Sequence, residues 1–280
     1  MIPTASTCAG AAPCLAGVGA ACAATAAPAL EARGLAIGHR QKRVGEGIDL
    51  MIRSGEVLCL LGPNGSGKTT LFRTLLGVLP ALSGSVQVGG RPLREWSRAE
   101  LASRIAYVPQ SPAMPFAFTL EELVLMGRAA HVGPFAQPSP HDCRVAAQAL
   151  AALGVGHLAA CACTEVSGGE RQLALIARAL AQEAGILILD EPTSSLDFGN
   201  QLRVLDCIGA LRAEGVAVLM STHQPEHALR VADRIAFLRS GRIVRQGGPD
   251  VVAPRALAEL YGTDEALVAA GMPGFGGRAR

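Results

Sequence analysis

The sequence predicts an α/β protein with a parallel core β-sheet, a small antiparallel β-sheet near the N-terminus and an inserted helical segment. The apolar runs Val57–Leu61, Ile186–Leu189 and Ala217–Met220 contain no charged residue. Such runs are typical of strands that are covered on both faces in a parallel sheet. Helical patterns separate these runs along the chain, and this alternation is the second observation that favours the α/β class.

Composition and charge exclude several classes of protein. The 280 residues carry a formal net charge of +2, with Lys and Arg scattered along the chain. Because there is no basic stretch of the kind that binds polyanions, we expect no nucleic-acid partner. The eight cysteines include one tight pair, Cys161 and Cys163, without a second Cys/His pair at a zinc-like spacing. We therefore expect a reducing compartment and no zinc centre.

The chain is predicted to have three parts. Residues 1–30 contain no charged side chain and are dominated by Ala. Pro13 and Pro28 interrupt this stretch and no basic region precedes it, so we expect a disordered extension rather than a membrane span or a secretory signal. Residues 31–262 form one domain. Residues 263–280 are expected to be a flexible tail.

The first half of the domain is predicted to contain several short strands. Alternating apolar residues predict strands over Leu35–Ile37 and Ile48–Ile52, which we expect to pair in the antiparallel sheet. The elements expected next are a helix after residue 70, a hairpin arm over 84–90, a helix opened by a capping box over 97–104, and a strand over 105–108.

Residues 111 to about 183 carry helical patterns and no convincing strand, which predicts an inserted helical subdomain. Thr119 and Glu122 form a capping box at the start of its first helix. Further helices are expected over 141–153 and 170–180, after a Pro- and Gly-rich linker over 127–140. The later elements are strands over 186–189, 217–220, 234–238 and 242–246, and helices over 200–213 and 225–232.

The segment over residues 62–70 has the pattern of a phosphate-binding loop. It follows the strand Val57–Leu61 and precedes a helix, which is the setting that such a loop requires. Its glycines let backbone N–H groups converge on phosphate oxygens, Lys68 adds a positive charge, and the Thr69 hydroxyl can ligate Mg²⁺. The residues expected to bind nucleotide here are Gly62, Pro63, Asn64, Gly65, Ser66, Gly67, Lys68, Thr69 and Thr70.

Polar side chains follow three other strands at the edge where open α/β sheets bind their ligands. Asp190 and Glu191 come directly after a buried strand. Asp190 is suited to hold Mg²⁺, and Glu191 could polarise the water that attacks the γ-phosphate. Gln110 can offer an amide oxygen to Mg²⁺ or water. His223 lies just past its own strand, and we expect it to contact the γ-phosphate.

The segment Val166-Ser-Gly-Gly-Glu-Arg-Gln172 resembles the signature motif of ABC ATPases. The other motifs of that family occur in family order as Walker A, Q-loop, Walker B, D-loop and switch histidine, at residues 62–70, 110, 186–191, 195–197 and 223. On this resemblance, which covers residues 34 to about 260, the chain is identified as a P-loop NTPase with an ABC-type ATPase domain.

The resemblance implies a head-to-tail homodimer that binds ATP and Mg²⁺ between its subunits. It assigns catalysis to Glu191, His223, Gln110 and Lys68, and the metal to Thr69, Gln110 and Asp190. The residues that would reach the nucleotide of the opposite subunit are Ser167, Gly168, Gly169, Glu170 and Asp197.

Two residues depart from the family pattern. Val166 replaces the usual Leu of the signature motif, a small change that we expect to be harmless. His39 stands where the family usually has a Tyr that stacks on adenine. Because an imidazole offers a smaller ring, we expect weaker nucleotide affinity than a Tyr would give.

Within the family, the chain resembles the ATPase subunits of importers for iron-siderophore, haem and vitamin B12. Gly127-Arg128, residues 116–126 and the segments that begin at Phe135, Glu170 and Ser195 carry this resemblance. It implies an ATP hydrolase that powers uptake of a metal chelate. Its partners would be two membrane permease subunits at the cytoplasmic face of the inner membrane and, indirectly, a periplasmic or extracellular substrate-binding protein. The cargo does not touch such a subunit, so the sequence leaves it open.

A groove beside Gln110, lined by Met114, Phe116 and Phe118, is expected to receive a coupling helix of the permease. Two alternatives remain at this point. One is a soluble ABC ATPase without a transport role, although the second ATPase half and the charged linker of the ribosome-acting type are missing. The other is the ATPase subunit of an ABC exporter, which differs in its permease.

Overall fold

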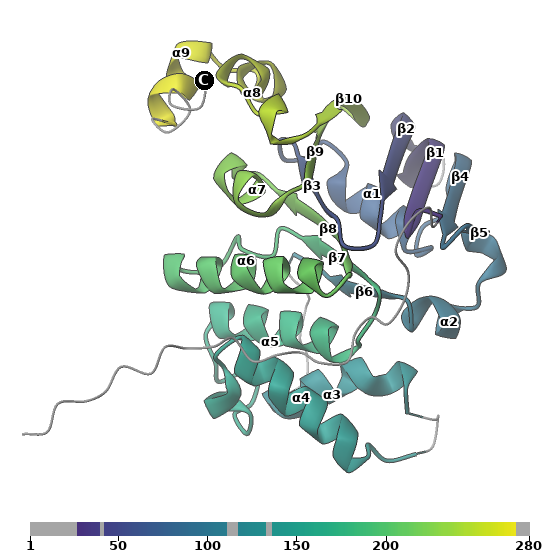
Figure 1. Cartoon of the computed structure of the whole chain (residues 1–280), viewed down its shortest axis with the longest axis vertical. Coiled ribbons are helices and arrows are strands. Elements are labelled where there is room, and N and C mark those ends of the chain that lie inside the picture. The colour runs from purple at the N-terminus through teal and green to yellow at the C-terminus, as the bar shows by residue number, and fades with distance from the viewer. Residues whose placement is uncertain (1–26, 40–41, 111–116, 133–135, 273–280) are drawn as a thin grey trace, which may run out of the picture.

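The computed structural model describes residues 27–39, 42–110, 117–132 and 136–272. Figure 1 shows two β-sheets in the middle of the molecule, a group of helices at one end, and two C-terminal helices at the opposite end. The protein is therefore of the α/β class that the sequence predicts, with separate parallel and antiparallel sheets.

The core sheet has six strands. Their spatial order is β10 (Arg242–Gly247), β9 (Arg234–Arg239), β3 (Val57–Leu61), β8 (Ala217–Thr222), β7 (Ile186–Asp190) and β6 (Ile105–Val108). All neighbouring pairs are parallel except β9 and β10. Leu61 is paired with Thr222, and Asp190 with Ser221, so the carboxyl ends of three central strands meet at one edge. The site residues follow these ends.

The antiparallel sheet has four strands, in the order β2 (Lys42–Ile52), β1 (Leu30–His39), β4 (Ser83–Val88) and β5 (Arg91–Pro92). The first strand begins earlier than expected, because Leu30 is fully buried and pairs with both Val88 and Ile52. Residue 30 therefore belongs to the sheet and not to the N-terminal extension. Residues 1–26 of that predicted extension lie outside the described residues. A short 3-10 helix (Leu93–Glu95) and helix α2 (Arg98–Ala102) follow β5, and the predicted capping box at Ser97 is confirmed.

The strands of the core sheet separate two hydrophobic cores. Leu58 and Leu60 of β3 belong to the core that is shared with helix α1 (Lys68–Leu75) and the antiparallel sheet. Cys59 and Leu61 face the opposite core. That core lies under α5 (Gly168–Ala181), α6 (Phe198–Ala213) and α7 (Pro225–Val231). Because both faces are covered, nearly every residue of β3, β7 and β8 is apolar, as the sequence analysis inferred.

The helical end of the molecule is built from residues between β6 and β7. Its elements are α3 (Leu120–Leu125), a 3-10 helix (Met126–Ala130), α4 (Pro140–Ala152), a second 3-10 helix (Gly156–Leu158) and α5. Capping boxes start α3 at Thr119, α4 at Ser139 and α5 at Ser167. The 3-10 helix occupies the first part of the segment that was expected to be a linker.

Arg128 in this 3-10 helix explains that difference. Its guanidinium is buried and donates to Asp142 Oδ1 at 2.9 Å, to Glu183 Oε2 at 2.6 Å and to the carbonyl of Ala181 at 2.7 Å. These contacts join α4 to the end of α5, and the backbone that carries Arg128 must follow them. Charge-assisted hydrogen bonds of this kind fix the orientation of the helices.

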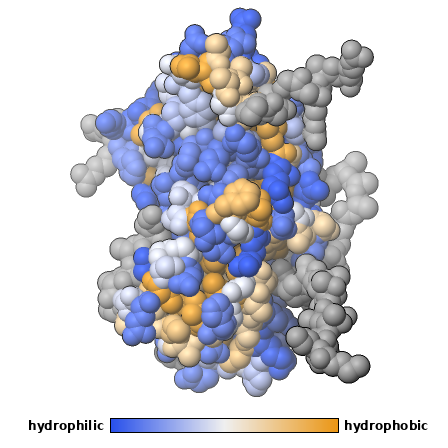
Figure 2. All heavy atoms as spheres, turned by 90° about the vertical axis from the view of Figure 1, so that its left-hand side faces the viewer, coloured by the Kyte–Doolittle hydropathy of each residue, from blue (hydrophilic) through white to orange (hydrophobic). Residues whose placement is uncertain are grey.

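The C-terminal part contains more helix than expected. A 3-10 helix (Pro249–Val251) and α8 (Pro254–Tyr261) are followed by α9 (Glu265–Gly271), in the range predicted to be a flexible tail. Gly262 ends α8 with a positive φ of 69°, and Asp264 caps α9 through its side chain. Figure 2 shows that polar residues cover most of the face with α5, α6 and α7, and that apolar residues form separate patches, one of them at the end with α9. In the described ranges, no helix has both the length and the apolar character needed to cross a membrane.

Candidate functional site

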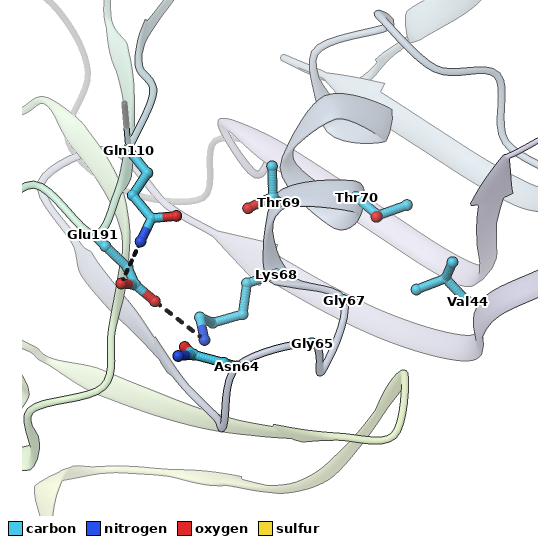
Figure 3. A pocket seen from close by; sticks show the side chains of 9 residues that line it. All are labelled: Val44, Asn64, Gly65, Gly67, Lys68, Thr69, Thr70, Gln110 and Glu191. Atoms are coloured by element: carbon cyan, nitrogen blue, oxygen red, sulfur yellow. Dashed lines mark hydrogen bonds and ion pairs between the residues drawn. The ribbon is translucent and has the colours of Figure 1, made fainter. Parts of the chain in front are cut away.

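A cavity of about 320 Å³ lies at the carboxyl edge of the core sheet (Figure 3). It is bounded by β2, by the loop between β3 and α1, and by the ends of β6 and β7. The lining residues are Val44, Asn64, Gly65, Gly67, Lys68, Thr69, Thr70, Gln110 and Glu191. The fold thus brings the predicted phosphate loop together with two of the polar residues that follow other strands.

The backbone of the phosphate loop depends on glycine. A Cβ atom at Gly62 would lie 2.3 Å from the carbonyl oxygen of Leu238, so no side chain fits there. Gly67 caps α1 with φ of 106°, a left-handed conformation that L residues adopt rarely. Helix α1 has no side-chain cap and no acidic residue in its first turn. Its N-terminal N–H groups and positive dipole end are therefore available to an anion in the cavity.

Lys68, the first residue of α1, points its ammonium group across the loop. Its Nζ donates to the carbonyl of Gly62 at 2.8 Å and of Pro63 at 3.2 Å, and lies 3.3 Å from Glu191 Oε1. The side chain is 6% exposed. The loop is further tied to the β9–β10 turn, because the carbonyl of Ser66 accepts a hydrogen bond from the Gly241 N–H at 3.1 Å. The Ser66 hydroxyl is buried and has no hydrogen-bond partner among the described residues.

Asp190 at the end of β7 is buried next to the start of α1. Its Oδ2 accepts a hydrogen bond from the Thr69 hydroxyl at 2.6 Å, and its Oδ1 accepts one from the Ser221 hydroxyl at 2.7 Å. A hydroxyl and a carboxylate therefore sit side by side at the edge of the cavity. Figure 3 shows the amide oxygen of Gln110 turned toward Thr69. These are hard oxygen donors of the kind that Mg²⁺ prefers, so the donor set fits this ion.

Glu191 has a carboxylate that three side chains contact. Its Oε2 accepts from Gln110 Nε2 at 2.9 Å and lies 3.3 Å from His223 Nδ1, while Oε1 faces Lys68. The residue is 6% exposed and its φ is 50°, in the left-handed region. Its backbone N–H donates to the Ser221 hydroxyl at 3.0 Å, which helps to hold this strained conformation. Three side chains and the hydrogen bond to Ser221 therefore fix the position of this carboxylate at the edge of the cavity.

The signature and D-loop residues lie together, but they do not line this cavity. Ser167 is the N-cap of α5, where its hydroxyl accepts from the Glu170 N–H and Glu170 accepts from the Ser167 N–H. These hydrogen bonds hold the pKa of Glu170 below its usual value. A Cβ atom at Gly169 would lie 3.5 Å from the carbonyl oxygen of Ser195. Asp197 caps α6 by accepting from the Asn200 N–H.

Gly168 is the first residue of α5, and a Cβ atom there would meet only the Arg171 guanidinium, at 3.9 Å. The start of α5 is therefore a second exposed helix N-terminus, and its residues are not among those that line the cavity of its own chain.

His39 and two residues that the sequence analysis missed complete the description. His39 is exposed at the end of β1, opposite Lys42, and is not among the cavity-lining residues. Val44 lines the cavity instead, although a single valine in a Gly- and charge-rich stretch gives no signal in the sequence. Ser221 joins Asp190 to the backbone of Glu191, and its position two residues before His223 was the available clue.

The groove predicted for a permease helix falls mostly outside the described residues, which include neither Met114 nor Phe116. Phe118 is described and is 38% exposed.

Known proteins provide an independent comparison. The family described as "ABC transporter" matches residues 46–194. An uncharacterised ABC transporter ATP-binding protein of Haemophilus influenzae is 42% identical over 240 residues, which is 85% of this chain and 91% of the relative. The hemin import ATP-binding protein HmuV of Streptomyces coelicolor is 43% identical over 231 residues, 82% of each chain.

A solved structure, of a metal-chelate type ABC transporter in an inward-facing conformation, has 34% sequence identity and a TM-score of 0.72. The similarity covers 84% of this chain and 89% of the chain in that structure. Together with the phosphate loop, the buried Asp190 and the Glu191 carboxylate beside it, these matches show that the chain belongs to the ABC transporter family and is an ATP hydrolase of that family.

Proposed function

We propose that this protein is the ATP-hydrolysing subunit of an ABC importer and that it powers the uptake of a metal chelate through partner permease subunits. The main support for ATP hydrolysis is the position of the Glu191 carboxylate. It contacts Lys68, Gln110 and His223, and it lies beside the N-terminus of α1, which has no side-chain cap. One site thus combines groups that bind a triphosphate with a base that can act on water.

The phosphate loop would bind the triphosphate of ATP. The N–H groups at the start of α1 can donate to its β- and γ-phosphate oxygens, and the Lys68 ammonium can exchange its carbonyl partners for phosphate oxygens. Glycines at 62, 65 and 67 leave room for the anion to approach the backbone. Val44 offers apolar contact to the nucleoside, and His39 remains our proposal for the residue that stacks on adenine.

Thr69 and Asp190 would hold Mg²⁺, with Gln110 as the third residue. The Thr69 hydroxyl and the Asp190 carboxylate are already 2.6 Å apart, and Figure 3 shows the Gln110 amide oxygen turned toward Thr69. When bound, the ion neutralises phosphate charge that develops during transfer of the γ-phosphoryl group. Ser221 keeps the Asp190 carboxylate in place for this role.

Glu191 would act as general base. Its carboxylate can take a proton from the water that attacks the γ-phosphate, while Gln110 and His223 hold the carboxylate and contact the same water or the phosphate. Positioning and charge neutralisation supply the rest of the rate enhancement, because phosphoryl transfer needs little covalent chemistry from the protein.

A second copy of the chain would complete the site. Ser167, Gly168, Gly169 and Glu170 form an exposed helix N-terminus that does not reach the cavity of its own chain. A head-to-tail homodimer would place this second anion-binding site, with Asp197, over the γ-phosphate held by the partner. ATP would then join the subunits and hydrolysis would release them.

The decisive test of the base is the Glu191→Gln variant. Replacing the carboxylate by an amide should lower kcat for ATP hydrolysis by roughly 10²–10⁴ and leave ATP binding intact, because the amide fills the same space but accepts no proton. The exposed Glu121 provides a matched control, since Glu121→Gln makes the same change away from the cavity. Normal turnover of Glu191→Gln would refute the assignment.

Transport and cargo are proposed from the resemblance to hemin import and metal-chelate transport proteins. The expected partners are two permease subunits in the membrane and a periplasmic or extracellular substrate-binding protein, which would place this subunit at the cytoplasmic face of the inner membrane. Stable co-purification with a multi-span membrane protein, followed by ATP-dependent uptake of hemin or an iron chelate in vesicles, tests this proposal. Export of the cargo would favour the exporter alternative. Purification without any membrane partner would favour the ABC ATPase without a transport role.

A further inference from the structure

The loop that carries His223 is held by a residue from the C-terminal helices. The carbonyl oxygen of His223 accepts a hydrogen bond from the Tyr261 hydroxyl at 3.2 Å. Pro225, the first residue of α7, has no N–H group to offer to this carbonyl. Tyr261 is thus a link, across 38 positions of the sequence, between α8 and the end of β8.

Tyr261 is itself well anchored. It is the last residue of α8, which buries Ala256, Leu257 and Leu260 against the sheet. Its own ring packs on the core that lies under α5, α6 and α7. The position of the phenol is therefore set by the packing of a whole helix, and it can hold a loop at a fixed distance.

The phenol also remains a donor over the working pH range. Burial, together with the nearby carboxylates of Glu191 and Glu226, raises the pKa of Tyr261 to about 12. The hydroxyl is therefore protonated in neutral solution.

The imidazole of His223 has few restraints of its own. Its side chain is 45% exposed, and its one hydrogen-bond distance within the described residues is the 3.3 Å to Glu191 Oε2. A long contact to an exposed ring fixes its direction weakly. The backbone of residue 223 therefore decides where the ring points, and Tyr261 holds that backbone.

We propose that Tyr261 is a positioning residue for His223: through the His223 carbonyl, α8 sets the imidazole against Glu191 and so controls the rate of ATP hydrolysis rather than the binding of ATP. The inference rests on the proposed role of His223. It also makes the C-terminal helices part of the catalytic unit, because any displacement of α8 reaches the imidazole through one hydrogen bond.

A second contact limits how far the loop can move when Tyr261 is altered. His227 Nδ1 lies 3.1 Å from the Thr193 hydroxyl, and this contact ties α7 to the segment that follows Glu191. The loop therefore keeps this restraint, and the hydrogen bond from the Gln224 N–H to the Thr222 hydroxyl, when the phenol hydroxyl is removed. We expect a partial loss of activity and not its abolition.

The test is a double-mutant cycle with Tyr261→Phe and His223→Ala in the full-length protein, measured by steady-state and single-turnover ATP hydrolysis. Tyr261→Phe removes one oxygen and keeps the ring, so it should lower kcat roughly threefold to tenfold, with the KM for ATP changed less than about twofold. In the His223→Ala background the same substitution should have no further effect. Arg255→Ala, on an exposed side chain of the same helix, is the control for general loosening of α8 and should leave kcat unchanged.

Three results would overturn the inference. Equal effects of Tyr261→Phe with and without His223 would show that it acts elsewhere, and a rise in KM at constant kcat would show that it acts on binding. If His223→Ala hydrolyses ATP more slowly than the parent, the proposed role of His223 stands even when either of these two results is found for Tyr261→Phe. If His223→Ala hydrolyses ATP at the parental rate, both the role of His223 and the inference about Tyr261 are wrong.

Discussion

At the scale of single residues, the predicted site residues meet because their motifs each follow a strand of the same sheet. Lys68, Gln110, Glu191 and His223 are far apart in the sequence, and their convergence follows from the parallel arrangement of β3, β6, β7 and β8. Motif spacing was sufficient to name them. Ser221, in contrast, acts through contacts to neighbours that only a three-dimensional structure reveals, so sequence reasoning missed it.

His39 provides a test at this scale. A His39→Tyr variant should bind ATP roughly threefold to tenfold more tightly than the parent. Stacking of one base on an aromatic side chain contributes roughly 1–3 kcal/mol, and the larger ring should gain part of this free energy. Titration with a fluorescent ATP analogue measures the Kd. His141→Tyr, on the exposed start of α4, makes the same change away from the cavity and should have no effect. If the parent and His39→Tyr bind ATP with equal affinity, residue 39 does not stack on adenine.

At the scale of elements, boundaries were predicted well where a local signal exists. The capping boxes at Ser97 and Thr119 start the helices that they were expected to start. The helix over 126–130 was not predicted, because its cause is the set of contacts that Arg128 makes with residues distant in the sequence. Helix α9 was missed because its short length and its Ala- and Gly-containing sequence resemble a loose tail.

The Arg128 contacts predict how the helical end responds to mutation. Arg128→Met keeps an unbranched side chain of similar length but leaves the buried Asp142 without its cation, and we expect Tm to fall by roughly 5–10 °C. The hydrogen bonds from Ser139 and the Arg128 guanidinium hold the pKa of Asp142 far below its usual value. The stabilisation is therefore present above the ordinary aspartate pKa and is lost as the pH falls through the depressed one.

Differential scanning calorimetry at neutral and at strongly acidic pH checks the fall in Tm and its pH dependence. The difference in Tm between the parent and Arg128→Met should shrink as the pH falls below the ordinary aspartate pKa. Arg144→Met, on the exposed face of α4, is the matched control and should melt like the parent. An equal Tm for Arg128→Met and the parent at neutral pH would show that these contacts contribute nothing to stability.

At the scale of the whole molecule, the two proposed half-sites of one chain are separate, because the residues at the start of α5 do not line the cavity. The cavity with the phosphate loop and the exposed start of α5 belong to different parts of the surface, and the second was predicted to serve another copy. The sequence could predict this arrangement only through the family resemblance, because no property of a single chain specifies its partner. The fold class followed from apolar runs and motif order, which depend on local pattern alone.

A complementation experiment tests the shared site. Ser167→Arg places a bulky cation in the signature helix and should abolish hydrolysis, and Glu191→Gln is expected to retain only a very small part of the parental rate. Mixed in equal amounts, the two inactive variants should recover up to about one quarter of the parental rate, because half of the dimers then contain one site with an intact loop and an intact signature helix. A mixture as inactive as its components, or a Ser167→Arg protein that hydrolyses ATP at the parental rate, would contradict the head-to-tail site.

The ion pair between Lys68 and Glu191 has a consequence for the proposed reaction. Lys68 Nζ lies 3.3 Å from Glu191 Oε1 and also donates to the carbonyl of Gly62, so one cation faces both the loop proposed to bind phosphate and the proposed base. We expect Lys68 to turn toward the phosphate oxygens when ATP binds, which would leave the Glu191 carboxylate without this counter-charge. Nucleotide binding and activation of the base would then be coupled through a single side chain.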